Sequence, residues 1–110
     1  MKVKNSVSKL ALLLVFTTSP LAHAQGTASQ SMLYTRSLAA TCANCHGTDG
    51  KAAQGATLVS IAGMDKNYLV TQLKAFKSGA RPATVMHQIS KGYSDAQIET
   101  LAGYFAAQKK

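Results

Sequence analysis

The feature that most constrains this chain is a short motif in which two cysteines stand two residues apart and a histidine follows directly. The motif is Cys42-Ala43-Asn44-Cys45-His46, and it contains both cysteines of the 110-residue chain. A disulfide across two intervening residues closes so short a loop that it gains little entropic stabilisation. The two cysteines therefore indicate a chemical role more than a stabilising crosslink.

Three kinds of site could contain this motif: a redox-active dithiol, a zinc site and a covalently attached haem. A thioredoxin-type redox pair requires a βαβ context, whereas the residues before Cys42 have helical spacing and no alternating strand. A structural zinc site requires four ligands, and the chain offers His46 and His87 beside the two cysteines. Covalent attachment of a c-type haem requires two thiols, here Cys42 and Cys45, for the vinyl groups and an adjacent imidazole for the iron. The motif favours haem attachment.

The N-terminal segment has the pattern of a secretory signal peptide. Three lysines precede an apolar run over residues 10–16, which is shorter than the roughly 20 residues of a membrane-spanning helix. A small-x-small cleavage site then ends at Ala24. We expect residues 1–24 to be a signal peptide and residues 25–110 to form the mature domain in the periplasm, with no integral membrane span. A retained N-terminal anchor is the alternative.

Charge and composition exclude several classes of protein. The net charge is +8, the hydrophobic content is 46% and the mean hydropathy is +0.01. Such values fit neither a disordered polyelectrolyte nor an integral membrane bundle. The longest basic run of the mature part is Lys109-Lys110, so we do not expect nucleic acid as a partner. A compact, basic, exported domain remains.

Hydrophobic periodicity predicts an all-α domain of four helices and loops, without strands. The first helix is expected over residues 30–41, so that it delivers Cys42 at its end, and a glycine-rich loop follows over residues 47–55. A second helix is expected over residues 65–77, with Ser78-Gly79 as its stop signal.

The C-terminal third predicts two more helices. Pro82 can open a short helix that holds Val85, Met86 and Ile89. Ser94, with Gln97 three residues later, has the spacing of a capping box for the last helix. One apolar stripe marks the buried face of that helix: Ile98, Leu101, Ala102 and Phe105.

The chain resembles the class I cytochromes c over about residues 31–108. Three segments carry the resemblance: CANCHGTDG (42–50), SIAG (60–63) and KGYSD (91–95). Two further segments, FKSG (76–79) and RPATVM (81–86), make it most similar to the cytochrome subunits of flavocytochrome c sulfide dehydrogenases. The resemblance implies the class I cytochrome c fold around one covalently attached haem.

The resemblance also implies the iron ligands. In this family the axial methionine lies shortly before the C-terminal helix, which implies Met86 as the sixth ligand beside His46. A Met/His pair favours ferrous iron and suits outer-sphere electron transfer. Consecutive helical residues point about 100° apart, so His87 and Met86 do not both face the iron. The candidates for the sixth position are Met32 and Met64, both expected to fill the core, Met86, His87 and, if the leader is retained, His23.

The sequence departs from the family at two positions. Many members have a proline before the SIAG-like segment, whose carbonyl accepts the second N–H of the histidine, and here Val59 offers the same carbonyl. Members also commonly have a glycine where the first helix crosses the last. Here Thr35 or Ser37 would be the small contact, with Ala102 and Gly103 on the other helix.

The function expected from these features is one-electron transfer by a periplasmic monohaem cytochrome, and no side chain is placed for acid–base or nucleophilic catalysis. The resemblance implies a redox partner, an FAD-containing sulfide dehydrogenase subunit whose flavin passes electrons from sulfide to this haem. A free shuttle to a respiratory complex and a five-coordinate haem sensor are the alternatives. In this fold a basic rim around the haem edge would steer an acidic partner, unless these side chains are merely solvated: Lys51, Lys74, Lys77, Arg81 and Lys91.

Overall fold

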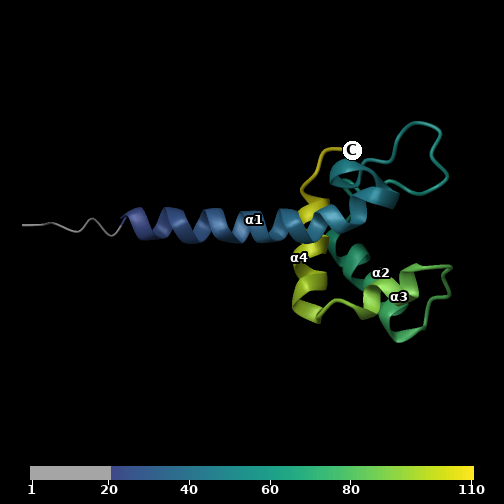
Figure 1. Ribbon diagram of the computed structural model, residues 1–110. Helices are drawn as coiled ribbons and strands as arrows, with labels where there is room; N and C mark the ends of the chain where they lie inside the picture. Colours follow the sequence, from purple (N-terminus) through teal and green to yellow (C-terminus); the bar gives the residue numbers. More distant parts are fainter. Residues whose placement is uncertain (1–20) are drawn as a thin grey trace, which may run out of the picture.

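The structure is a computed structural model that describes residues 21–110, with side chains from residue 26 onward. Helix α1 projects from a globular part in which α2, α3 and α4 lie together (Figure 1). No strand occurs in the described residues, so the prediction of an all-α fold is confirmed. The elements are α1 (Leu21–His46), the 3-10 helix η1 (Thr48–Gly50), α2 (Lys66–Ser78), α3 (Met86–Lys91) and α4 (Asp95–Ala106).

Helix α1 is longer than predicted at both ends. It continues beyond residue 41 through the whole cysteine motif, because the first residue that stops it is Gly47, with φ 82°. The predicted end at Thr41 is therefore wrong, and both cysteines belong to the last turns of the helix. Residues 1–20 of the predicted signal peptide lie outside the described residues, so its cleavage after Ala24 stays a prediction. None of the described helices is long and apolar enough to cross a bilayer.

The predicted stop of α2 and the predicted capping box of α4 are confirmed, and Asp65 adds a cap at the start of α2. The Asp65 carboxylate accepts a hydrogen bond from the backbone N–H of Tyr68 at 2.8 Å, and Gly79 ends α2 in the left-handed conformation at φ 83°. Ser94 and Gln97 form the reciprocal capping box of α4. These local side-chain signals fix where both helices begin.

Helix α3 begins later than predicted. Its first residue is Met86, with Val85 before it at φ −132°, so Pro82 lies in the preceding loop instead of opening the helix. Thr84 and Val85 are both β-branched, which slightly lowers their helix propensity and agrees with the late start. Met86 is consequently held at the very beginning of a helix.

The core lies where α1, α2 and α4 meet. The predicted stripe of α4 is confirmed as its buried face: Ile98, Leu101, Ala102 and Phe105. Ala39 from α1 and Leu69 from α2 complete the cluster with three of these residues. The small residue of α1 in the core is thus Ala39 and not Thr35 or Ser37, since those two lie on less buried sides of the helix. A Cβ atom at Gly103 would lie near the Lys66 side chain of α2, at 3.9 Å, whereas Ala102, the other small residue predicted for this crossing, is buried in the same cluster as Ala39.

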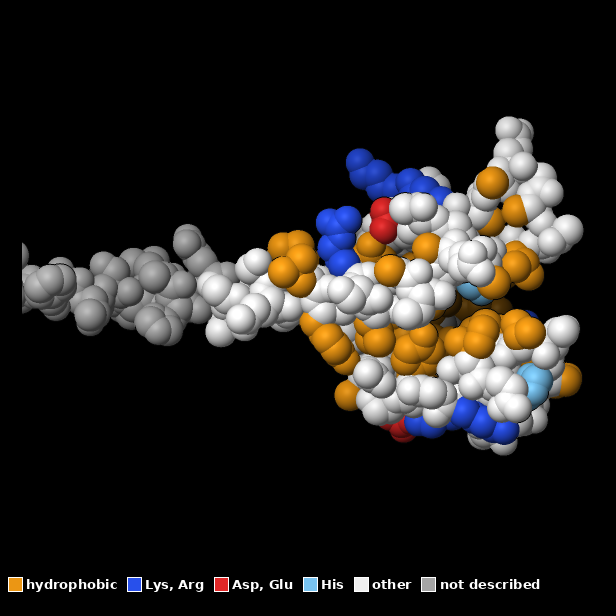
Figure 2. All heavy atoms as spheres, in the orientation of Figure 1, with side chains coloured by type: hydrophobic (Ala, Val, Ile, Leu, Met, Phe, Trp, Pro, Cys, Tyr) orange, Lys and Arg blue, Asp and Glu red, His pale blue; other side chains and the backbone are white. Residues whose placement is uncertain are grey.

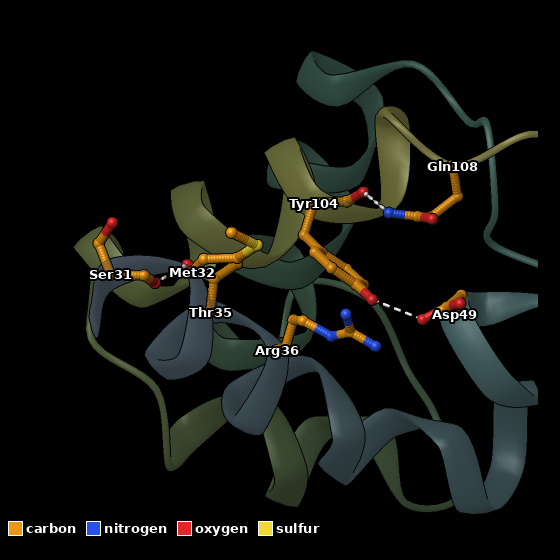
Figure 3. Close-up of a pocket in the computed structure, with 7 residues that line it drawn as sticks. All are labelled: Ser31, Met32, Thr35, Arg36, Asp49, Tyr104 and Gln108. Carbon is orange, nitrogen blue, oxygen red and sulfur yellow. Dashed lines mark hydrogen bonds between the residues drawn. The ribbon is translucent and has the colours of Figure 1, made fainter. Parts of the chain in front are cut away.

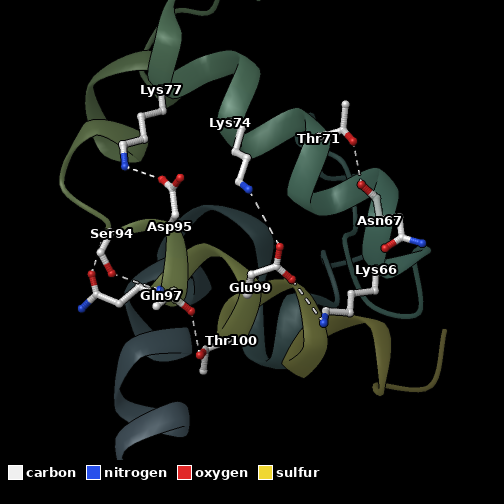
Figure 4. A network of polar contacts seen from close by, with 11 residues as sticks. Lys66, Asn67, Thr71, Lys74, Lys77, Ser94, Asp95, Gln97, Glu99 and Thr100 are labelled. Atoms are coloured by element: carbon white, nitrogen blue, oxygen red, sulfur yellow. Dashed lines mark hydrogen bonds and ion pairs between the residues drawn. The ribbon is translucent and has the colours of Figure 1, made fainter.

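Ion pairs join α2 to α4 on the outer surface (Figure 4). Glu99 pairs with Lys66 at 3.2 Å and with Lys74 at 3.9 Å, and Lys77 pairs with Asp95 at 2.8 Å. The hydrogen bond from Lys77 lowers the pKa of the Asp95 carboxyl. Exposed pairs of this kind contribute little to stability, because water screens the charges and the long side chains lose entropy when they are held in place. Their larger effect is that two lysines of the predicted basic rim, Lys74 and Lys77, have their charge compensated here.

The burial of the α4 stripe predicts a large difference between two leucine truncations. Leu101 is 1% exposed and Leu33 is 63% exposed. We expect Leu101→Ala to lower the free energy of unfolding of the holoprotein by about 2–5 kcal/mol, because it leaves a cavity in the core. Leu33→Ala, the matched control, should cost less than about 0.5 kcal/mol. Urea denaturation followed by circular dichroism measures both, and equal losses would contradict the described core.

Candidate functional site

An apolar cavity of about 400 Å³ lies beside the end of α1. Figure 2 shows hydrophobic side chains gathered around this hollow on one face of the globular part. Helix α2 contributes Leu69, Leu73 and Phe76 to the wall, and α4 contributes Leu101 and Phe105. A volume in this range is typical of cofactor and ligand sites.

His46 enters this cavity in a fixed orientation. Its Nδ1 lies 2.8 Å from the carbonyl oxygen of Val59, as the family resemblance implied. A carbonyl only accepts hydrogen bonds, so Nδ1 carries the proton and Nε2 keeps a free lone pair. The hydrogen bond thus selects the tautomer that can bind a metal ion through Nε2.

The Val59 carbonyl is positioned by a cluster of bonds around Gly50. The Gly50 carbonyl oxygen accepts hydrogen bonds from Ile61 N at 2.8 Å, Ala62 N at 3.1 Å and Ser60 Oγ at 2.9 Å. Gly50 has φ 78°, and a Cβ atom there would lie 2.7 Å from Ile61 and 2.8 Å from Phe105. Only glycine fits this position, and it ties the segment that carries Val59 to the segment that follows His46.

A second contact anchors the same segment to α4 (Figure 3). Asp49 adopts a left-handed backbone at φ 55°, and its carboxylate accepts a hydrogen bond from the Tyr104 hydroxyl. This bond raises the pKa of Tyr104, with desolvation as the next cause. The two residues also line an open hollow of about 420 Å³ together with Arg36. The sequence analysis missed the contact, since no local pattern connects residues 55 positions apart.

The two cysteines are not joined to each other by a disulfide. Cys42 is half-buried and lies on the cavity wall, whereas Cys45 is exposed. Burial raises the pKa of the Cys42 thiol, against a smaller lowering by its hydrogen bond with Thr41. Residues three apart lie on the same side of a helix, so the last turns of α1 present both sulfurs beside His46.

Two methionines line the cavity. Met86 does so from the start of α3 and Met64 from the loop before α2. The expectation that Met32 fills the core is wrong, because its side chain is 59% exposed on α1, while Met64 does pack against the core. His87 is not on the cavity wall, and its Nδ1 is buried without a hydrogen-bond partner.

The donor set of the cavity fits a c-type haem. It comprises a thiol at Cys42, an imidazole nitrogen at His46 and a soft thioether at Met86 on largely apolar walls, with Cys45 three residues from Cys42. A zinc site finds less support, because no three Cys, His, Asp or Glu side chains cluster as metal ligands within residues 26–110. Three of the four predicted site residues, Cys42, His46 and Met86, therefore line the same cavity. Met64 provides a second thioether on its wall.

Comparison with known proteins agrees with a c-type haem site. Residues 35–109 match the family described as Cytochrome c. The chain is 41% identical over 73 residues to the cytochrome subunit of sulfide dehydrogenase from Chlorobaculum tepidum, covering 66% of this chain and 64% of that protein. It is 34% identical over 100 residues to cytochrome c4 from Pseudomonas aeruginosa, covering 91% and 47%. It is 35% identical over 74 residues to cytochrome c-554(548) from Halomonas halodenitrificans, covering 63% and 86%. The chain thus spans less than two thirds of the first two relatives.

The Asp49 contact predicts a change in tyrosine titration. In Asp49→Asn the pKa of Tyr104 should fall toward the usual value of about 10, because the carboxylate no longer opposes ionisation. Ultraviolet difference spectra between pH 8 and 12 follow the tyrosinate, and Tyr104→Phe identifies its component.

The same pKa has a consequence for stability. Because the pKa of Tyr104 is raised in the folded state, its contribution is present below about pH 10 and is lost as pH rises through the folded pKa. The alkaline loss of stability should therefore be weaker in Tyr104→Phe. An Asp49→Asn titration identical to that of the wild type would contradict the described contact.

Proposed function

Because the chain belongs to the cytochrome c family, we propose that it is a periplasmic one-electron carrier whose apolar cavity holds a single haem c. Haem c supplies an iron that alternates between the ferric and ferrous states. Cys42 and Cys45 form the two thioether links, while His46 and Met86 bind the iron. The observation that carries this assignment is the meeting of Cys42, His46 and Met86 on one cavity wall.

His46 serves as the fifth ligand through Nε2. The Val59 carbonyl holds the proton on Nδ1 and fixes the plane of the ring. A hydrogen bond of this kind also raises the basicity of the imidazole, which strengthens its bond to the metal. Gly50 and Ser60 keep the carbonyl in place through the bonds described above.

Met86 serves as the sixth ligand. A neutral thioether favours the ferrous state, and so does a wall that excludes water, because the ferrous centre carries less charge. Met64 lines the same cavity, but the family resemblance assigns the ligand to the position shortly before the C-terminal helix, where Met86 begins α3. Neither side chain changes charge during electron transfer.

The mouth of the cavity offers a surface for the redox partner. Several apolar side chains are exposed there, among them Leu58, Val59 and Ile89. Electrons pass between proteins by close approach of the cofactor edge, and an apolar mouth lets a partner displace water from it.

No Asp or Glu lines the cavity in the described part of the chain, so acid–base catalysis has no carboxylate there.

The partner we propose is acidic, and the arrangement of charges supports this. All four acids of the chain make internal contacts: Asp49 with Tyr104, Asp65 at the start of α2, and Asp95 and Glu99 with lysines. Six cations of the described residues have no ion pair: Arg36, Lys51, Arg81, Lys91, Lys109 and Lys110. Five of these cations, all except Arg81, lie outside the cavity wall, and their uncompensated charge attracts an acidic protein and makes association fast and salt-sensitive.

A more specific proposal follows from the similarity to the cytochrome subunit of a sulfide dehydrogenase. In it the chain accepts electrons from an FAD-containing subunit that oxidises sulfide. The free shuttle remains the competing role, because the relatives also include cytochromes c4.

The axial ligand is tested by a matched pair of variants. Met86→Ala should abolish the weak long-wavelength charge-transfer band of ferric haem that reports methionine ligation, and should lower the reduction potential. Met64→Ala, which also removes a thioether from the cavity wall, should keep the band. Visible spectra of the ferric proteins and redox titration measure both effects. Loss of the band in Met64→Ala alone would contradict the assignment, and its absence from the wild type would favour a five-coordinate sensor.

The partner is tested by co-expression with an FAD-containing sulfide dehydrogenase subunit of the same organism. We expect a 1:1 complex on gel filtration, and reduction of the haem by sulfide only when the flavoprotein is present. The rate of that reduction should fall as salt rises, because the cations that attract the partner are screened. A chain that always elutes as a lone monomer would contradict the complex and favour the free shuttle.

A further inference from the structure

Arg81 is the only Lys or Arg on the wall of the cavity in the described residues. The proposed haem c would bring two carboxylates, its propionates, to this cavity. A carboxylate beside apolar walls is costly unless a charged donor pairs with it. The remaining ionisable side chains on the wall are Cys42, His46, Tyr68 and Tyr93, and none of them is a fixed cation.

The guanidinium of Arg81 is held in place by the end of α2. It lies over the Phe76 ring, 4.7 Å from the centroid, and its Nη1 donates to Gln72 Oε1. Its backbone N–H donates to the Ala75 carbonyl at 3.1 Å. Gly79, in the left-handed conformation at φ 83°, turns the chain so that residue 81 returns to the helix. The side chain is therefore oriented before any ligand arrives.

These contacts leave donors free at the cavity. An arginine has five N–H groups in a planar fork that matches a carboxylate, and Gln72 uses one of them. The Gln72 side chain, whose Oε1 is taken by Arg81, keeps its amide N–H groups as further donors on the same wall. Two polar groups thus converge on an otherwise apolar surface.

We propose that Arg81, assisted by Gln72, binds a propionate carboxylate of the haem. The assignment rests on the proposed function, since it requires the haem in this cavity. Arg81 is then a cofactor-binding residue and not part of the surface that attracts the redox partner. Its positive charge stabilises the ionised propionate and keeps the pKa of that carboxyl low.

The experiment is a redox titration of the holoprotein over a range of pH. Ionisation of a propionate lowers the reduction potential, so the potential shows a step at the propionate pKa. In Arg81→Gln that step should move up by at least about one pH unit, because the carboxylate loses its cation. Arg81→Lys, which keeps the charge without the fork, should move it less, and Gln72→Ala should give a smaller shift in the same direction.

Lys74→Gln is the matched control. It removes the same charge from α2, but Lys74 pairs with Glu99 and is not on the cavity wall. Its pH step should coincide with that of the wild type. An unchanged step in Arg81→Gln, or an equal shift in Lys74→Gln, overturns the assignment of Arg81 while an intact haem c spectrum leaves the proposed function standing. A wild-type protein without covalent haem would overturn both.

Discussion

The hydrogen bond between His46 Nδ1 and the Val59 carbonyl is the interaction on which the arrangement of this protein depends. It joins the last residue of α1 to a loop 13 positions further along, at 2.8 Å. Because α1 continues through the cysteine motif, the same bond sets the position of both thiols relative to the cavity. The Gly50 carbonyl supports it by accepting three hydrogen bonds from the residues after Val59.

Local signals made much of this fold predictable from the sequence. The α2 stop at Gly79 and the capping box at Ser94 involve residues within a few positions of each other, so the sequence pattern contains the whole interaction. The apolar stripe of α4 is likewise a property of one helix. The carbonyl at Val59 was predicted from the family resemblance, and the structure confirms that it meets His46.

Other features depend on residues that are distant in the chain. Ala39 is in the core because α1 packs against α4, and the bond between Asp49 and Tyr104 joins η1 to α4. No local spacing indicates either contact. The continuation of α1 past Thr41 follows from the absence of a stop signal before Gly47, which the prediction underestimated. The late start of α3 is the opposite case, since Pro82 permits a helix but does not require one.

The structure also changes how the lysines and arginines are interpreted, because it shows which of them are paired with acids. From the sequence, Lys74 and Lys77 belong to a basic rim, but both are compensated by acids of α4. The remaining cations have different surroundings: Arg81 lies on the cavity wall, whereas Lys91 ends α3 outside it. A net charge therefore says little about a binding surface until the internal pairs have been subtracted.

The small size of the core bears on why the proposed cofactor would be covalently attached. Of the seven buried hydrophobic residues described, three are alanines, so the chain buries few large side chains by itself. A small domain whose core holds few large side chains gains from a further source of stability. A haem tied to the last turns of α1 would cover the apolar walls contributed by α2, α3 and α4 at a high effective concentration. The covalent links would then hold α1 against the rest of the fold, because the cysteines and His46 occupy the end of that helix.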